Sequence, residues 1–147
     1  MIAIDELKDE WKIDSHIDSS KIREEILKSA QLHAKYLTLL MDFKREYRKK
    51  ESNILTVTKV KMRYYRGELN KTQLDSMGWE QYQGTKPIKS EMESLLSTDA
   101  DLIELNTELE DIKIILDSLE SIMKAITSRS YDLKTFIEAE KFYAGGH

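Results

Sequence analysis

The chain has 147 residues, a formal net charge of −4, five glycines, one proline and no cysteine. The missing cysteines exclude disulfides and thiolate chemistry, and the scarcity of glycine and proline favours long helices over strands and turns, so we expect an all-α fold. No apolar run approaches the roughly 20 residues that span a bilayer, so we expect a soluble, cytoplasmic protein without a membrane-spanning segment.

The N-terminal third predicts two helices. Residues 3–13 form a short amphipathic pattern around Ile4, Leu7 and Trp11. Residues 17–20 then offer side-chain oxygens for a helix start, followed by Glu24 and Glu25, which suit the positive end of a helix. The second helix continues, with or without a kink at 48–53, to Gly67. Its expected apolar stripe is Ile22, Ile26, Ala30, His33, Leu37, Leu40, Phe43 and Tyr47.

The end of this second helix is strongly basic. Residues 44–66 hold nine basic and two acidic side chains, a local charge of +7. Alternating cations at 58–66 are suited to successive phosphates, and a tyrosine pair offers flat faces for unpaired bases, so single strands fit better than duplex. A solvated helix face is the alternative interpretation. The predicted DNA-binding residues are Lys44, Arg45, Arg48, Lys49, Lys50, Lys59, Lys61, Arg63, Tyr64, Tyr65 and Arg66.

Residues 67–87 collect three glycines, one asparagine and the only proline around a short helix at 72–77, and this composition predicts a loop region. Trp79 and Tyr82 within it are expected to be local packing anchors. A further helix is predicted at 88–96. Thr98 then predicts the cap of the last helix, with Asp101 completing an acidic variant of the capping box.

The last helix carries a heptad pattern over 102–137. Apolar residues recur at alternating spacings of three and four, broken only by Ser130, which is typical of helices that associate. Ile115, Ile122 and Phe136 widen the stripe and favour an assembly larger than a dimer. Packing against the second helix of the same chain is the alternative. The predicted oligomerisation residues are Leu102, Leu105, Leu109, Ile112, Leu116, Leu119, Met123, Ile126, Leu133 and Ile137.

No pattern indicates catalysis, a metal or a cofactor. His16, His33 and His147 lack metal-type spacing, and His33 is expected in the apolar core. Residues 90–122 have a local charge of −9, and their carboxylates are expected to be solvated faces. An enzyme with a carboxylate-built metal site on this helix would require metal-dependent turnover, which nothing in the sequence indicates.

Four segments, in the same order along the chain, resemble the UvsY family of recombination mediators of T-even-like bacteriophages. These segments are 16–22, 59–67, 89–101 and the stretch from 125–131 through 142–146, and residues 78–81 resemble cyanobacterial myovirus variants. The family has a Leu-Lys-Ala-Arg-type DNA-contact motif before a tyrosine pair. Lys59 matches the motif lysine, while Lys61 stands in place of the arginine and lacks its planar fork.

The resemblance implies a mediator that binds single-stranded DNA and loads a UvsX-type recombinase onto strands covered by the phage single-strand-binding protein. It also implies a ring-like homo-oligomer, hexameric or heptameric, in the cytoplasm of the infected bacterial host. We therefore expect a helical nucleic-acid-binding region at 1–87 and a helical oligomerisation region at 88–147. The alternative is a coiled-coil structural adaptor that binds only proteins, with its basic segment facing acidic partners.

Overall fold

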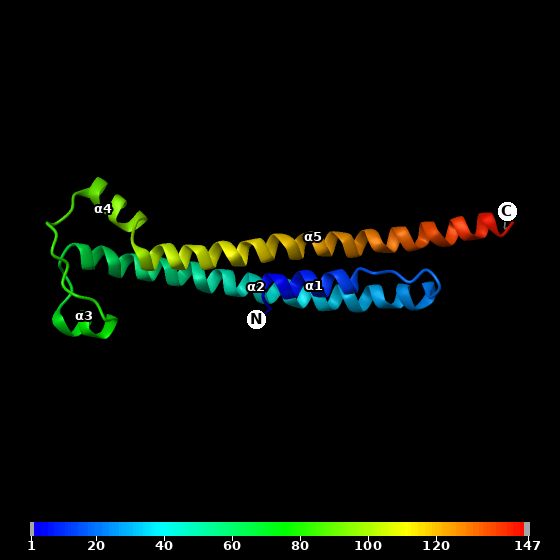
Figure 1. Cartoon of the computed structure of the whole chain (residues 1–147), viewed down its shortest axis with the longest axis horizontal. Helices are drawn as coiled ribbons and strands as arrows, with labels where there is room; N and C mark the ends of the chain where they lie inside the picture. The colour runs from blue at the N-terminus through cyan, green and yellow to red at the C-terminus, as the bar shows by residue number, and fades with distance from the viewer. Residues whose placement is uncertain (1, 146–147) are drawn as a thin grey trace. The chain divides into compact units, whose positions relative to one another are not determined.

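The structure is a computed structural model that describes residues 2–145, so Gly146 and His147 lie outside the described residues. The described chain is helical and without strands, which confirms the predicted all-α fold. It contains helices α1 (Ile4–Asp14), α2 (Ile22–Tyr65), α3 (Lys71–Met77), α4 (Lys89–Ser97) and α5 (Ala100–Tyr143), drawn in Figure 1. Two compact units share the long helices: the first unit combines 1–45 with 111–147, and the second unit is 46–110.

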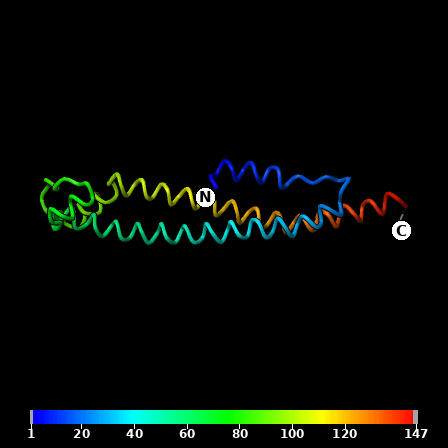
Figure 2. The backbone as a smooth tube through the Cα atoms, turned by 90° about the horizontal axis from the view of Figure 1, so that it is seen from below, coloured from blue at the N-terminus to red at the C-terminus, as the bar shows by residue number. Residues whose placement is uncertain are grey.

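In the first unit, α1 and the C-terminal part of α5 both run along the N-terminal part of α2, antiparallel to it (Figure 2). The core is made by apolar side chains from all three helices. Tyr36 and Leu119 are fully buried at its centre. The buried members are Leu7, Leu32, Tyr36, Leu40, Phe43, Ile115, Leu119, Ile122 and Ile126.

The predicted apolar stripe of α2 is partly wrong. Leu40 and Phe43 are buried as expected, but Ala30 and His33 are exposed, so His33 is not a core histidine. The buried line runs one position earlier, through Leu32 and Tyr36. Neighbouring lines on a helix both contain apolar residues here, and periodicity alone cannot separate lines that lie one residue apart.

A buried ion pair explains why a glutamate lies on the core side of α2. The Arg129 guanidinium is bonded to the Glu25 carboxylate, and it also donates to the Glu25 carbonyl at 3.2 Å and to Ser29 Oγ at 3.0 Å. Burial raises the pKa of the Glu25 carboxyl, but the bond from Arg129 outweighs it and holds the pKa below its usual range. The pair therefore joins α2 to α5 electrostatically as well as by packing.

The C-terminal end of α1 is held to α2 by polar and aromatic contacts. Tyr36 Oη donates to Asp14 Oδ2 at 2.8 Å, Lys35 Nζ donates to the same oxygen at 2.7 Å, and the Trp11 and Tyr36 rings meet edge to face at 5.3 Å. Burial raises the pKa of Asp14, but the bonds from Lys35 and Tyr36 outweigh it and leave the pKa lowered. The short helix predicted at 3–13 is thus a packing arm of the first unit.

None of the ten predicted heptad positions is exposed in the single chain. Leu119 and Ile126 belong to the core cluster, and Ile112, Leu116 and Met123 pack against it. The wide stripe on α5 is therefore used largely inside the protomer, as the alternative interpretation of the heptads proposed. The assignment of these residues to an interface between protomers remains a prediction.

In the second unit, glycines follow the ends of α2 and α3, and polar side chains cap the starts of α3 and α5. Gly67 and Gly78 follow α2 and α3 with φ of +71° and +70°, a conformation that glycine adopts without strain. Asn70 and Gln73 form a reciprocal capping box at the start of α3. The predicted Thr98 cap of α5 is wrong by one residue, because Asp99 Oδ1 accepts the Leu102 N–H at 3.0 Å.

Candidate nucleic-acid interface

Four exposed cations of the second unit lie along one side of α2. Lys59, Arg63 and Arg66 follow one another at spacings of four and three residues, so they share a face of the helix. Arg48 lies on the same face about three turns earlier. All four side chains are exposed, and none has an ion-pair partner within residues 2–145. Arg48, Lys59, Arg63 and Arg66 are called the basic ridge below.

Two other predicted DNA-binding lysines face the opposite way. Lys50 Nζ is bonded to Glu108 Oε2 at 2.5 Å, and Lys61 is paired with two aspartates near the start of α5. Lys61 lies two residues from both Lys59 and Arg63, which places it on the far side of the helix. The nine cations of the basic segment are therefore divided between a solvent face and an internal face.

The remaining predicted cations are exposed. Lys49 is exposed beside the ridge with Glu46 at 3.5 Å, a weak pair at a surface. Lys44 and Arg45 belong to the first unit, where both are exposed. These three side chains are free to meet an anion without breaking a buried contact.

Lys61 is the most buried cation of the second unit, with 6% of its side chain exposed. Its ammonium lies 2.7 Å from Asp101 Oδ2, 3.1 Å from Asp99 Oδ2 and 4.0 Å from the centre of the Trp79 ring. Burial lowers the pKa of Lys61, but the bonds to Asp101 and Asp99 outweigh it and leave the pKa raised. Lys61 is therefore charged and fully partnered.

Asp99 connects this lysine to the tyrosine pair and to the helix start. Its Oδ2 accepts a hydrogen bond from Tyr65 Oη at 2.5 Å while its Oδ1 caps α5. Burial raises the pKa of Asp99, but the bonds from Tyr65, the Leu102 N–H and Lys61 outweigh it and keep the carboxyl ionised. Burial and the neighbouring Asp99 together raise the pKa of the Tyr65 hydroxyl, which stays protonated and can donate.

Four aromatic rings gather around the end of α2 and are called the aromatic cluster: Tyr64, Tyr65, Trp79 and Tyr82. The Tyr64 ring lies 5.2 Å from Tyr65 and 5.2 Å from Trp79, and Tyr65 meets Tyr82 edge to face at 5.0 Å. Tyr64 Oη also donates to the Glu80 carbonyl at 2.7 Å. All four rings are half-buried, so Trp79 and Tyr82 pack as predicted and Tyr64 and Tyr65 are only partly available to a ligand.

Sequence reasoning missed that Asp99 and Asp101 neutralise Lys61. The partners are 38 and 40 residues away, across a loop region whose course no local pattern predicts. The acidic composition of 90–122 is consistent with such pairing, but composition alone indicates a solvated face equally well. An acidic cap that follows a basic helix in the chain could have suggested the pairing.

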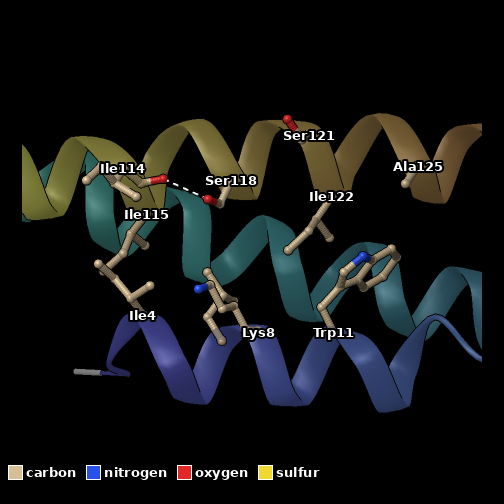
Figure 3. Close-up of a pocket in the computed structure, with 10 residues that line it drawn as sticks. Ile4, Lys8, Trp11, Ile114, Ile115, Ser118, Ser121, Ile122 and Ala125 are labelled. Carbon is tan, nitrogen blue, oxygen red and sulfur yellow. Dashed lines mark hydrogen bonds between the residues drawn. The ribbon is translucent and has the colours of Figure 1, made fainter.

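The first unit offers a different kind of surface. A groove of about 670 Å³ lies between α1 and α5, and Ile4 and Trp11 point across it toward Ile115 and Ile122 (Figure 3). Lys8 is the one cation among its lining residues. An apolar groove with a single charge suits a protein segment rather than a polyanion.

Within residues 2–145, no three or more histidine, aspartate or glutamate side chains are grouped so that they could hold a metal ion. None of the described helices combines the length and apolar content needed to cross a membrane.

Comparisons with known proteins give the family of the chain. Residues 10–146 match the family model described as recombination, repair and ssDNA binding protein UvsY. The recombination protein uvsY of Enterobacteria phage T4 is 30% identical over 144 residues, which cover 98% of this chain and 99% of the relative.

Crystal structures of the bacteriophage T4 recombination mediator protein UvsY have the same fold. One lattice form matches with a TM-score of 0.84 at 27% identity and covers 98% of this chain and 99% of that chain. A second form gives 0.80 at 25% identity, covering 97% and 99%. The chain belongs to the UvsY family of recombination, repair and single-stranded-DNA-binding proteins.

Proposed function

We propose that this chain mediates recombination by holding single-stranded DNA along the basic ridge of α2. The observation that carries the proposal is the ridge itself: Lys59, Arg63 and Arg66 are exposed, aligned and without ion-pair partners among the described residues. Cations of this kind release condensed counterions when they meet phosphates, which favours binding without any sequence preference. The adjoining aromatic cluster supplies half-exposed rings on which unpaired bases can stack.

The strand would be bound by several copies of the chain at once. We propose a ring-like homo-oligomer, hexameric or heptameric, in which weak individual sites act together because a strand bound to one protomer is held near the next. The heptad residues are largely used inside the protomer, so exposed apolar side chains of the first unit are better candidates for the contact. Met41 on α2 and Ile114 on α5 are 63% and 50% exposed.

Partners follow from the proposed role. The T4 relative is a recombination mediator, and we propose that this chain likewise promotes loading of a UvsX-type recombinase onto strands covered by the phage single-strand-binding protein. It would act by binding rather than by catalysis, in the cytoplasm of the infected bacterial host. The apolar groove between α1 and α5 is available for such protein contacts.

The test is a titration of labelled single-stranded and duplex oligonucleotides at several salt concentrations. Replacing Lys59 and Arg63 with Ala should weaken single-strand binding and reduce the salt slope by about 0.7 for each lost phosphate contact. Replacing Lys124 and Lys134, two exposed lysines of α5, removes the same charge elsewhere and is the matched control. Equal affinities for the ridge variant, the control and the unchanged protein would contradict the proposal and favour an adaptor that binds only proteins.

A further inference from the structure

Lys61 lies within the basic segment but not on its DNA-facing side. Its side chain is 6% exposed, and its ammonium is bracketed by two carboxylates at 2.7 Å and 3.1 Å. A phosphate that approached this ammonium would also approach Asp99 and Asp101, and like charges at such distances repel. Lys61 therefore has neither the exposure nor the local potential that a phosphate contact needs.

The same side chain joins three separate parts of the second unit. It extends from α2, its ammonium pairs with the start of α5, and it lies 4.0 Å from the centre of the Trp79 ring in the loop after α3. A desolvated cation over an indole face is among the stronger cation–π arrangements. Lys61 is thus the charged centre of the contact that connects α5, α2 and the loop.

The loop depends on such contacts because residues 79–88 contain no helix. Trp79 is held by its backbone N–H bonded to the Leu74 carbonyl at 3.0 Å, by the Tyr64 ring and by the Lys61 ammonium. Gly84 lies directly against the Tyr82 side chain, where a Cβ atom would collide. The half-exposed rings of the loop are therefore placed by a few specific neighbours rather than by regular backbone structure.

We infer that Lys61 is a positioning residue, which holds the Trp79 ring in the aromatic cluster so that this ring stacks a base of the bound strand, while Lys61 itself touches no phosphate. The inference rests on the proposed function, since it assigns roles within the same single-strand site. It divides the basic segment into phosphate-contacting cations on the ridge and one internal cation that acts through an aromatic ring. It also makes Trp79 a strand-contacting residue.

Salt dependence separates the two roles. Lys61→Met keeps the length of the side chain but removes the charge, and it should weaken single-strand binding on the order of tenfold, the loss expected for one stacked base. Its salt slope should equal that of the unchanged protein, because no phosphate contact is lost. Lys59→Ala, in contrast, should lower the slope by about 0.7. Lys61→Arg keeps a cation over the indole and should restore most of the affinity.

Coupling between the two residues tests whether Lys61 acts through Trp79. Trp79→Leu should weaken binding as much as Lys61→Met, and the double variant should bind no worse than either single variant.

In a Trp11→Phe background, where Trp79 is the only tryptophan, Lys61→Met should shift the emission of the free protein to the red. Strand binding should quench the Trp79 fluorescence of the Trp11→Phe protein. The quenching should be much weaker when Lys61→Met is added.

The outcomes distinguish this inference from the proposed function. If Lys59→Ala changes neither affinity nor slope, the proposed function fails. If Lys59→Ala behaves as expected, the proposed function stands. The positioning role is then overturned if Lys61→Met also lowers the salt slope, or if the losses of affinity from Lys61→Met and Trp79→Leu add in the double variant. Asp101→Asn provides a folded reference, because the Asp101 side chain is 54% exposed. That variant should leave the slope unchanged; a steeper slope would mean that Lys61, once released, contacts phosphate.

Discussion

The interactions that stabilise the first unit differ from those that stabilise the second. Of the buried apolar side chains among the described residues, ten belong to the first unit and four to the second. The second unit instead depends on the Lys61 ion pairs, the Asp99 cap and the aromatic cluster. Apolar burial is the main favourable term in folding, so the first unit is the stable scaffold and the second is the part that polar changes can rearrange.

The difference assigns a separate task to each unit. The first unit has the larger core, and among the described residues its buried ion pair is Arg129 with Glu25. The second unit carries the basic ridge and the aromatic cluster, where ligand contacts require polar groups near the surface. Substitutions should therefore change the stability of the first unit and the binding behaviour of the second.

The largest effect is expected for Arg129→Met. The Glu25 carboxylate would remain buried without its partner, which costs about 3–5 kcal/mol of unfolding free energy. Chemical denaturation followed by circular dichroism measures the loss. Lys134→Met, on an exposed site of the same helix, is the control, and Glu25→Leu combined with Arg129→Met should recover much of the stability. A single variant as stable as the control would contradict this account of the pair.

Leu119→Ala should lower the unfolding free energy by about 2–5 kcal/mol, because the side chain is fully buried and its removal leaves a cavity. Leu55→Ala removes the same atoms from a side chain that is 68% exposed and should change stability by less than about 0.5 kcal/mol. Thermal and denaturant unfolding give both values. Similar losses for the two variants would mean that the core has been placed wrongly.

The helical fold was largely predictable from sequence, because each helix has local signals. Five helices close to the observed ones are predicted by the apolar periodicities and by the scarcity of glycine and proline. The glycines at 67 and 78 mark where two of these helices end. The starts were less accurate, since Asp99 rather than Thr98 caps α5 and both residue types are suitable caps. Such choices are decided by tertiary contacts, here Lys61 and Tyr65 on the far side of Asp99.

The candidate site was predictable in composition but not in orientation. Lys59, Arg63 and Arg66 were recognisable as a basic segment, whereas the internal position of Lys61 depends on residues 38 and 40 positions away. The sequence places His33 and Leu37 in the core, but both are exposed in the structure. The buried line of α2 instead includes Glu25, and a glutamate is expected at the surface unless its partner Arg129 is known. Long-range charge pairing was the missing information in both cases.

Acid should affect the second unit before the first. The pKa of Asp99 is lowered in the folded chain, so its contribution to stability is complete above the ordinary aspartate pKa of 3.8 and is lost as the pH falls below it. The pKa values of Asp14 and Glu25 in the first unit are also lowered, so their contributions to stability are lost in the same direction. The larger apolar core of the first unit should keep that unit folded to a lower pH. Emission of Trp79 in a Trp11→Phe protein should therefore change at a higher pH than emission of Trp11 in a Trp79→Phe protein.

A smaller effect is expected at the surface of the first unit. Met41→Asp together with Ile114→Asp should reduce the mass of the assembly in sedimentation while circular dichroism stays unchanged, because both side chains are exposed in the protomer. Single-strand affinity should fall with the mass as multivalent binding is lost. Leu55→Asp is the matched control in the second unit. An unchanged mass would place the contact between protomers elsewhere.

The division of cations on α2 is tested most directly by lysine footprinting with an amine-reactive label and mass spectrometry, with and without a single-stranded oligonucleotide. Lys59 should be labelled in the free protein and protected when the strand is bound, because it is exposed on the ridge. Lys61 should stay unlabelled in both states, because its ammonium is buried between Asp99 and Asp101. Labelling of Lys61 in the free protein, with protection by the strand, would contradict the account.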